Sequence, residues 1–494
     1  DAVRVTLETV SMRHMFSDRH ARHTPPTRPM DPVIIIGAGW AGLSAALHLR
    51  QAGVPVRVLE AAPQAGGRAR RQVLSWPDTD GIALDNGQHL LLGAYRDTLD
   101  LVAWLDGQGM DRLPLRIENA AGLQLRRRRH VLAAGTPDSL SRQLAESLSL
   151  LAAVLTARGL SRGNRLQLVW TLFRARAAGW RPPVGVRTVA EWYQYTRQPA
   201  RLVQQLWDPL VISAMNTPPA LASATVFLRV LRDSLGQAPT ASDFVLAGQD
   251  LAALFVDPAV DWLERHGCPV RLRTPVREIR VDLQARPHHG YLLRAFDPSA
   301  GEQQLRARHL VLATPPWTAA RLLADLAPPA SLAPLEGFGW RPITTAYVGW
   351  RAGNHALPTR LPPVFSLVDA QGKAQPAHWY FDRGRRAGWH LGALVISDSG
   401  EAMAQGEDAL RAGLQKQLAT ALSLPPAEHI VLIHEKRATF SCTDDRPLVT
   451  PGSLLPQLPG VALAGDYSYG GYPATLEGAV RSGRMAAEII LSGV

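Results

Sequence analysis

Three glycines and one glutamate have the residue types and the spacing to hold a dinucleotide. Gly37, Gly39 and Gly42 follow the pattern Gly-x-Gly-x-x-Gly, and an acid follows 18 residues later at Glu60. The first glycine permits a tight turn, the second lets backbone N–H groups approach a pyrophosphate, and the third lets a helix pack closely on a strand. The carboxylate can accept hydrogen bonds from both ribose hydroxyls.

These residues need a strand, a turn, a helix and a second strand to bring them together. Val33–Ile36 is an apolar run typical of a buried strand, and the residues after the turn have helical spacing up to Gly53. A second apolar run, Val56–Leu59, ends at the acid. The helix would face the phosphates with its positive dipole end. An ordinary βαβ unit also contains a glycine turn, but that alternative leaves Glu60 unexplained, so we predict a dinucleotide site.

Composition limits the class of protein. The chain has 494 residues, 46% of them hydrophobic, which is enough for two or three domains of about 150 residues each. The net charge of +11 suits anionic partners, unless arginine simply occupies solvated faces. Cys268 and Cys442 are the two cysteines and stand far apart. We therefore expect no disulfide, no metal site and a reducing compartment.

Two segments bear on membranes. Residues 1–30 contain five arginines but no continuous apolar stretch, so we expect an N-terminal arm and not a signal peptide. Pro209–Leu228 is uncharged and long enough to span a bilayer, but an Asn-Thr-Pro-Pro sequence interrupts its middle. We expect two helices joined by a turn there. The localisation expected is cytoplasmic, with peripheral attachment to the inner face of the cell membrane as an added expectation.

A second glycine pair and a C-terminal motif are typical of flavin proteins. Gly66-Gly67 precedes Arg68, whose charge can neutralise phosphate, and Gly465-Asp466 ends a strand-like run. With these motifs the chain resembles the flavin amine oxidase and phytoene desaturase superfamily. The resemblance implies FAD and an α/β fold, with a Rossmann-like FAD-binding domain of the glutathione-reductase/amine-oxidase type and a discontinuous α+β substrate domain. The expected division is an arm over 1–30, an FAD-binding domain from 31–112, 248–330 and 440–494, and a substrate domain from 113–247 and 331–439.

The resemblance also assigns cofactor contacts. Asp466 would contact the ribityl–pyrophosphate region, and the backbone of Val276 would bind adenine. A helix over 474–491 would place its first N–H groups beside flavin N1 and O2, where negative charge develops on reduction. The FAD-binding residues expected from all these motifs are Gly37, Gly39, Trp40, Ala41, Gly42, Glu60, Gly67, Arg68, Gln88, His89, Val276, Ala313, Gly465, Asp466, Ala474, Thr475 and Leu476.

Three motifs narrow the resemblance to one branch. Asn86-Gly87-Gln88-His89 stands where phytoene desaturases usually have a Gly-Pro-Thr element. Together with the Asn216–Pro219 turn and the Gly471–Gly478 ending, it resembles the hydroxysqualene dehydroxylase group, also called squalene-associated FAD-dependent desaturases. The resemblance covers residues 31–494. It implies a hydrophobic isoprenoid substrate, hydroxysqualene, and hydride transfer from reduced FAD to an allylic cation. The product would be squalene for hopanoid or triterpenoid biosynthesis.

This chemistry needs an acid that protonates the leaving oxygen. Asp85, His89 and Glu477 fall in segments that the resemblance places near the isoalloxazine, and a carboxyl group in an apolar pocket has a raised pKa. Each has a structural alternative: Asp85 can cap a turn, His89 can bond to backbone, and Glu477 can brace the flavin helix. The aromatic side chains expected nearest the flavin are Trp40, Tyr467, Tyr469 and Tyr472.

One segment of the expected substrate domain is rich in both arginine and apolar residues. Residues 147–190 contain seven arginines and no acidic residue. This pattern suits docking on an anionic membrane, in which a long polyene dissolves, but a helix packed on its own domain with solvated arginines fits equally well. A second basic cluster, Arg126–Arg129, has no interleaved aromatic residues, so no nucleic-acid partner is expected.

Two other classes of function compete. An oxidative flavoenzyme, either a polyene desaturase or an amine oxidase, is the first. A lysine often supports flavin chemistry in amine oxidases, and the three lysines here, Lys373, Lys416 and Lys436, stand outside the flavin motifs. The second class is a flavin-binding scaffold without turnover, which a steady-state assay would distinguish from an enzyme.

Overall fold

The computed structural model describes residues 31–107, 109–127, 148–282, 284, 290–353, 357–358, 361–369 and 376–493. The expected N-terminal arm, and Arg128–Arg129 of the second basic cluster, lie outside the described residues. Among the helices of the described residues, none is both long enough and apolar enough to span a bilayer.

A five-stranded parallel sheet has the strand order β10-β2-β1-β14-β20. Its strands are short aliphatic runs, and β1 is buried along its whole length, as expected for a parallel sheet covered on both faces. In register, Val33 of β1 pairs with Val56 of β2, and Ile34 pairs with Leu310 of β14. The predicted strand, helix and second strand after the N-terminal arm are therefore confirmed. The strands are β1 (Val33–Ile36), β2 (Val56–Leu59), β10 (Val270–Arg271), β14 (Leu310–Leu312) and β20 (Val461–Leu463).

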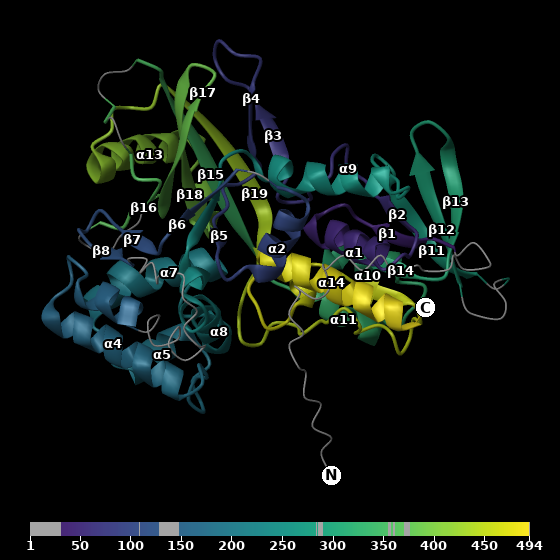
Figure 1. Ribbon diagram of the computed structural model, residues 1–494, viewed down its shortest axis with the longest axis horizontal. Helices are drawn as coiled ribbons and strands as arrows, with labels where there is room; N and C mark the ends of the chain where they lie inside the picture. The colour runs from purple at the N-terminus through teal and green to yellow at the C-terminus, as the bar shows by residue number, and fades with distance from the viewer. Residues whose placement is uncertain are drawn as a thin grey trace, which may run out of the picture.

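The first and last helices of the described chain pack against each other beside this sheet (Figure 1). Their close approach requires Gly483, where a Cβ atom would overlap the carbonyl oxygen of Ala41. The hydroxyl of Ser44 donates to the carbonyl oxygen of Val480 at 2.8 Å. The C-terminal helix predicted from its spacing is thus present. The helical elements on this side are α1 (Trp40–Gln51), α2 (Arg96–Trp104), η4 (Ala252–Val256), α9 (Asp257–Arg265), α10 (Pro316–Leu322), α11 (Pro329–Glu336), η5 (Asp466–Ser468) and α14 (Leu476–Gly493).

An antiparallel meander of three strands lies at the end of the molecule that contains the parallel sheet (Figure 1). Its first strand follows β10 along the chain, so the two short strands predicted over 270–279 are both present. The strands are β11 (Val276–Asp282), β12 (Gly290–Asp297) and β13 (Gly301–Ala307).

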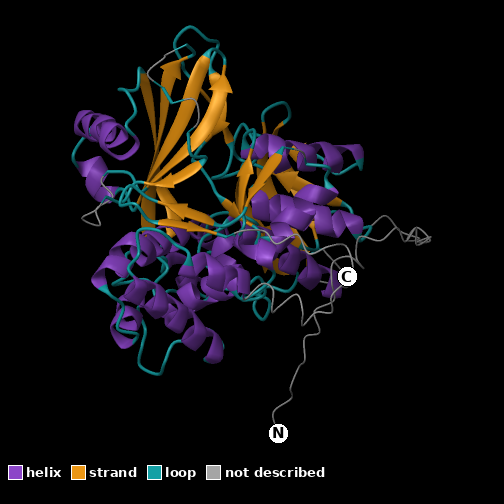
Figure 2. Ribbon diagram, turned by 60° about the vertical axis from the view of Figure 1, so that its left-hand side comes forward, coloured by secondary structure: helices purple, strands orange, loops and turns teal. Residues whose placement is uncertain are grey.

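The second large sheet is antiparallel, with the order β16-β17-β18-β15-β19. Helix α13 packs on it through Leu410, Leu414 and Leu418, which share a core with Val348 and Trp350 (Figure 2). Strand β19 runs from this sheet towards the parallel sheet and its helices (Figure 1). The elements are β15 (Trp340–Arg351), β16 (Val364–Ser366), β17 (Trp379–Arg386), β18 (Trp389–Ser397), α12 (Gly400–Ala404), α13 (Glu407–Leu422) and β19 (His429–Phe440).

A group of helices lies between residues 162 and 242 of the chain. The uncharged stretch Pro209–Leu228 contains parts of two helices, as predicted, and not one continuous helix. The first helix ends at Asn216, whose φ of 45° is left-handed, and the second begins at Ser223, whose hydroxyl accepts from the backbone N–H of Val226. The elements are α4 (Arg162–Ala177), α5 (Val189–Tyr195), α6 (Ala200–Leu202), η2 (Val203–Trp207), α7 (Asp208–Met215), α8 (Ala224–Leu235) and η3 (Pro239–Ser242).

Small sheets join the two sides of the molecule. Strand β9 pairs with both β5 and β6. The expected domain boundaries at residues 112 and 247 therefore fall within this three-stranded sheet, and the division into domains stays a prediction. The strands are β3 (Arg71–Leu74), β4 (Ile82–Asp85), β5 (Leu91–Leu92), β6 (Met110–Leu113), β7 (Arg116–Glu118), β8 (Gln124–Arg126) and β9 (Phe244–Ala247).

Candidate functional site

The glycine turn after β1 leaves the start of α1 open to an anion. Gly37 has a φ of 108°, and a Cβ atom there would overlap the carbonyl oxygen of Ala313. Gly39 faces Gly67, whose Cα would lie 3.9 Å from a Cβ on Gly39. Helix α1 has no side-chain cap and no acid in its first turn. Its first N–H groups can therefore donate to a phosphate that the bare glycine backbone allows to approach.

Glu60 stands at the end of β2, half-buried, with both carboxylate oxygens turned to backbone. One oxygen accepts from the N–H of Ala38 at 2.7 Å, and the other accepts from the N–H of Ala62 at 2.8 Å. The carboxylate thus connects the glycine turn to the loop after β2. Each oxygen has a second lone pair, so this arrangement is compatible with the expected bonds to ribose.

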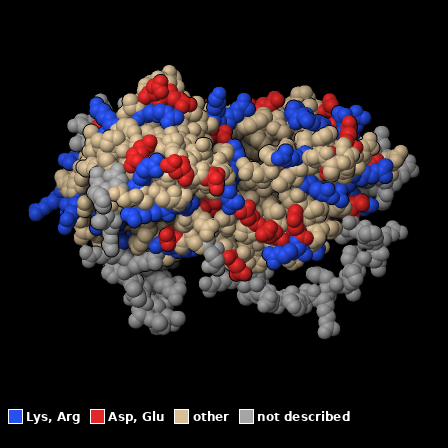
Figure 3. Space-filling view, turned by 90° about the horizontal axis from the view of Figure 1, so that it is seen from above, with Lys and Arg blue, Asp and Glu red and all other residues tan. Residues whose placement is uncertain are grey.

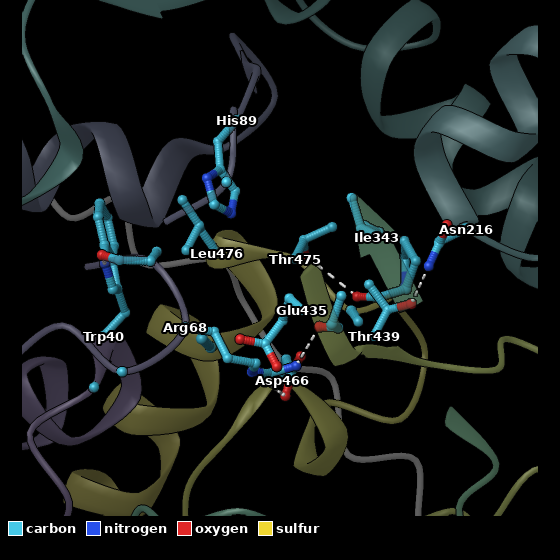
Figure 4. A pocket seen from close by; sticks show the side chains of 18 of the residues that line it. Trp40, Arg68, His89, Asn216, Ile343, Glu435, Thr439, Asp466, Thr475 and Leu476 are labelled. Carbon is cyan, nitrogen blue, oxygen red and sulfur yellow. Dashed lines mark hydrogen bonds and ion pairs between the residues drawn. The ribbon is translucent and has the colours of Figure 1, made fainter. Parts of the chain in front are cut away.

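One cavity of about 1430 Å³ contains nearly all of the expected cofactor residues. Gly42 alone among them does not line it, because it packs against the carbonyl oxygen of Gly37 in the close helix–strand contact predicted for it. Figure 4 shows Trp40 and His89 on one side of the cavity and Asn216 on the other. Pockets for drug-sized ligands measure about 300–1,000 Å³. The larger volume here can hold a dinucleotide and a second molecule.

Arg68 and Asp466 form an ion pair within this cavity. Arg68 Nη2 lies 2.7 Å from Asp466 Oδ1, and Arg68 Nη1 donates to the carbonyl oxygen of Ala438 at 2.6 Å. Asp466 also accepts from the N–H of Tyr467. Arg68 therefore positions Asp466, in addition to its expected role of neutralising a phosphate.

Buried polar atoms without partners mark the part of the cavity near the Asn-Gly-Gln-His motif. Gln88 Oε1, His89 Nδ1 and the hydroxyl of Tyr467 have no hydrogen-bond partner among the described residues. Burial lowers the pKa of His89 to about 4, so its imidazole is neutral at pH 7. Buried polar atoms normally find partners. The C=O and N–H groups of a flavin ring would supply them, so the residues present fit FAD.

The start of α14 completes this end of the cavity. Thr475 caps the helix, since its hydroxyl accepts from the N–H of Gly478 at 3.0 Å. Ala474, Thr475 and Leu476 all line the cavity, as expected for residues beside a flavin ring. The helix dipole places partial positive charge there.

Two of the three expected acids do not line the cavity. Asp85 accepts from the N–H of Leu251 at 2.6 Å, and burial raises its pKa to about 6. Glu477 is fully buried and accepts from the N–H and the hydroxyl of Thr98, at 2.9 and 2.7 Å, and pairs with Arg481 at 2.8 Å. It therefore caps the start of α2. His89 is the one expected acid that lines the cavity, and its neutral form makes it a weak proton donor.

The aromatic expectation is met in part. Trp40, Tyr467 and Tyr472 line the cavity. Tyr469 does not line it, because its hydroxyl accepts from Arg481 Nη1 at 3.1 Å.

Strand β19 contributes site residues that no local motif predicted. Glu435 lines the cavity and accepts from Asn86 Nδ2 at 3.3 Å. Lys436, expected outside the flavin motifs, also lines it. Within the described residues the cavity has three carboxylates, at Glu60, Asp466 and Glu435, and Glu435 is the one that lies beyond every motif. Only the pairing of β19 with β15 brings it there.

Beyond the polar part, the same cavity continues as an apolar chamber. Leucines and aromatic residues from the helices and from the antiparallel sheet line it, and many of them come from residues 115–244, where the Asn216–Pro219 turn was the one motif used. The chamber includes Leu115, Ile117, Leu125, Leu150, Val154, Leu168, Leu172, Leu206, Trp207, Leu210, Phe227, Val230, Leu231, Leu235, Phe244, Trp340, Ile343, Trp379, Phe381 and Val395.

Comparison with known proteins adds names to this geometry. The sequence pattern of the family described as "Flavin containing amine oxidoreductase" matches residues 40–491. The hydroxysqualene dehydroxylase of Rhodopseudomonas palustris is 28% identical over 93% of this chain and 98% of its own length. The protein of the same name in Sinorhizobium fredii is 27% identical over the same shares. A putative protoporphyrinogen oxidase from Exiguobacterium sp. 255-15 superposes with a TM-score of 0.63 at 16% identity, over 94% of this chain and 100% of that chain.

Proposed function

The chain belongs to the flavin containing amine oxidoreductase family and is an FAD-dependent oxidoreductase with the α/β fold predicted from its motifs, and we propose that it reductively dehydroxylates hydroxysqualene to squalene. The carrying observation is the single cavity that joins the cofactor residues to a long apolar chamber. A linear C30 hydrocarbon fills such a chamber without leaving buried polar groups unpaired. The names of the relatives over nearly the whole chain support the same substrate.

The reaction divides between cofactor and protein. Reduced FAD, when bound, supplies the hydride that the substrate carbon accepts. The hydroxyl leaves as water after gaining one proton, and the allylic carbon that loses it gains the hydride, so the sum is one C–O bond broken and one C–H bond formed. The protein must therefore hold the carbon in place, donate the proton and exclude bulk water.

We infer that Glu435 is the proton donor. Of the three cavity carboxylates in the described chain, Asp466 is paired with Arg68, and Glu60 is bonded to two backbone N–H groups. Glu435 accepts from Asn86 Nδ2 at 3.3 Å and has no ion pair among the described residues, so its carboxyl group is available to a substrate hydroxyl. Trp207 and Phe227 are among the aromatic side chains that line the chamber, and aromatic faces beside the substrate can stabilise a developing cation.

The proposal extends to where the protein acts. The apolar substrate dissolves in lipid, and the arginine-rich segment 158–187 carries no acidic residue. We propose that the protein attaches peripherally to an anionic membrane, and that high salt weakens this attachment.

The direction of electron flow distinguishes the proposed dehydroxylation from the desaturase alternative. Enzyme reduced in heavy water without oxygen should convert hydroxysqualene to squalene, with one deuterium at the former carbinol carbon, because flavin N5 exchanges with solvent. Squalene without deuterium would contradict direct hydride transfer. If oxidised enzyme instead consumes a saturated polyene segment and no squalene forms, the desaturase alternative is correct.

The proton donor has its own test. Glu435→Gln should lower turnover by about 10²–10⁴-fold, keep its FAD content and flatten the pH profile of kcat. Glu264→Gln, on the exposed surface of α9, is the matched control and should behave as wild type. Unchanged turnover in Glu435→Gln would reject this assignment.

A further inference from the structure

Six exposed apolar side chains gather on two neighbouring helical segments. Residues 148–155 are helical and precede α4, and Arg165 Nη1 of α4 donates to the carbonyl oxygen of Leu155 at 3.0 Å. Several of the six are more than half exposed. Exposed apolar residues are usually scattered singly over a protein surface and do not gather in this way. We call this set the docking surface: Leu148, Leu151 and Leu155 on the first segment, and Leu166, Trp170 and Phe173 on α4.

The spacing places each trio on one helical face. Positions 148, 151 and 155 are three and four residues apart, and positions 166, 170 and 173 are four and three apart. The rings of Trp170 and Phe173 stack with their centroids 5.8 Å apart. The exposed residues therefore form a continuous stripe along each helix and are not random exceptions to burial.

The same two helices line the substrate chamber with their other faces. Leu150 and Val154 of the first segment, and Leu168 and Leu172 of α4, all line the cavity. These residues are again one helical turn apart. The wall between the chamber and the docking surface is thus one helix thick.

The charged side chains of residues 148–187 are all arginines. Arg158, Arg162, Arg174, Arg176 and Arg181 are exposed and form no ion pair with any carboxylate that the structure describes. On the face seen from above, by contrast, basic and acidic side chains are interspersed (Figure 3). Helix α4 lies at the opposite, lower side of the molecule in Figure 1.

We propose that the docking surface inserts into the headgroup layer of an anionic lipid bilayer, and that substrate passes from the acyl chains into the chamber between these two helices. Apolar side chains flanked by arginines match the boundary between acyl chains and anionic headgroups. A substrate that takes this path does not cross water. The choice of a bilayer as partner rests on the proposed function, since it follows from an apolar substrate, but the binding itself can be measured without substrate.

The test is flotation of the FAD-loaded protein with vesicles of phosphatidylcholine containing phosphatidylglycerol. Leu166→Ser/Trp170→Ser/Phe173→Ser should lower vesicle partitioning by at least about tenfold, because three apolar side chains leave the lipid. The matched control Val281→Ser/Phe296→Ser, at exposed apolar positions of β11 and β12, should partition as wild type. FAD content and thermal unfolding show that both variants are folded.

Other outcomes would overturn the proposal. Unchanged partitioning of the triple variant, or equal loss in the control, would reject the docking surface. A wild-type dimer that the triple variant converts to a monomer, with no vesicle binding by either, would assign the surface to self-association. Should the triple variant misfold, Arg162→Gln/Arg176→Gln must weaken binding to anionic vesicles or the proposal fails. Vesicle binding without dehydroxylation would leave the docking surface standing and reject the proposed reaction.

The path has a separate readout. The triple variant should turn over substrate at the wild-type rate in detergent micelles and lose turnover when the substrate is presented in vesicles. Equal loss in both media would show that the helices serve the chamber alone.

Discussion

Replacing Glu60 with alanine should weaken FAD binding by two to four orders of magnitude. The carboxylate stands between the glycine turn and the next loop, with bonds of 2.7 Å from Ala38 and 2.8 Å from Ala62, and it lines the cavity. A hydrogen bond to a charged group contributes about 1.5–3 kcal/mol, so two bonds to ribose contribute about 3–6 kcal/mol. That free energy corresponds to about 10²–10⁴ in Kd.

The assay separates the ribose bonds from the loop bonds. Deflavinated protein is titrated with FAD, and with FAD whose adenosine ribose lacks both hydroxyls, while flavin fluorescence is followed. If the carboxylate holds the ribose, the wild-type protein binds the analogue more weakly than FAD, whereas Glu60→Ala binds the analogue and FAD with equal affinity. If it only orders the loops through Ala38 and Ala62, the variant weakens both ligands equally. Wild-type affinity of Glu60→Ala for FAD would refute the reasoning, and Asp261→Ala, an exposed acid on α9, controls for lost charge.

Three further predictions follow from buried groups. Glu477→Ala should destabilise the protein by about 3–5 kcal/mol in urea unfolding, because it removes the closer carboxylate partner of Arg481 and the acceptor of the Thr98 N–H and hydroxyl; Glu477→Gln should cost less, and a loss of turnover without a loss of stability would return Glu477 to the list of catalytic candidates. The pKa of His89, lowered to about 4 by burial, lies below its unfolded value of 6.5, so stability is complete above pH 6.5 and lost as the pH falls towards 4. The loss should reach about 3 kcal/mol in the apoprotein, and an equal pH dependence in His89→Gln would contradict this cause. FAD should be released into the supernatant by acid precipitation, because burial raises the pKa of the Cys442 thiol to about 11 and suppresses its nucleophilic form; flavin in the pellet would show covalent attachment.

The parts of the fold that sequence predicts well are those specified by neighbours in the chain. The turn at Gly37, the helix after it and the acid at Glu60 lie within one βαβ unit, so residue spacing determines their geometry. The C-terminal helix is likewise evident from its own periodicity. Nearly every cofactor residue expected from the motifs and the resemblance therefore lines the cavity.

The residues that sequence did not predict depend on contacts between distant segments. Glu435 reaches the cavity because β19 pairs with β15, which begins almost a hundred residues earlier. Glu477 stands within a flavin motif, yet its side chain turns to the start of α2, since the N–H groups of Asp97 and Thr98 have no carbonyl partner within that helix and attract a carboxylate. A cofactor motif therefore predicts where the backbone of a neighbouring residue lies. The direction of its side chain depends on the other elements that pack against the same helix.

The interleaved sheet constrains how the protein is made. Strand β1 emerges early from the ribosome, but its sheet is completed by β20, and the helix that covers Ala41 and Ser44 comes later still, with Ser44 and Val480 separated by 436 residues. Until β20 has been synthesised, the edge of β14 lacks its partner strand, and until α14 has been synthesised, the apolar face of α1 lacks the helix that covers it. Unpaired strand edges and exposed apolar faces favour aggregation. The flavin site is therefore complete only after Asp466 and the start of α14 have been synthesised.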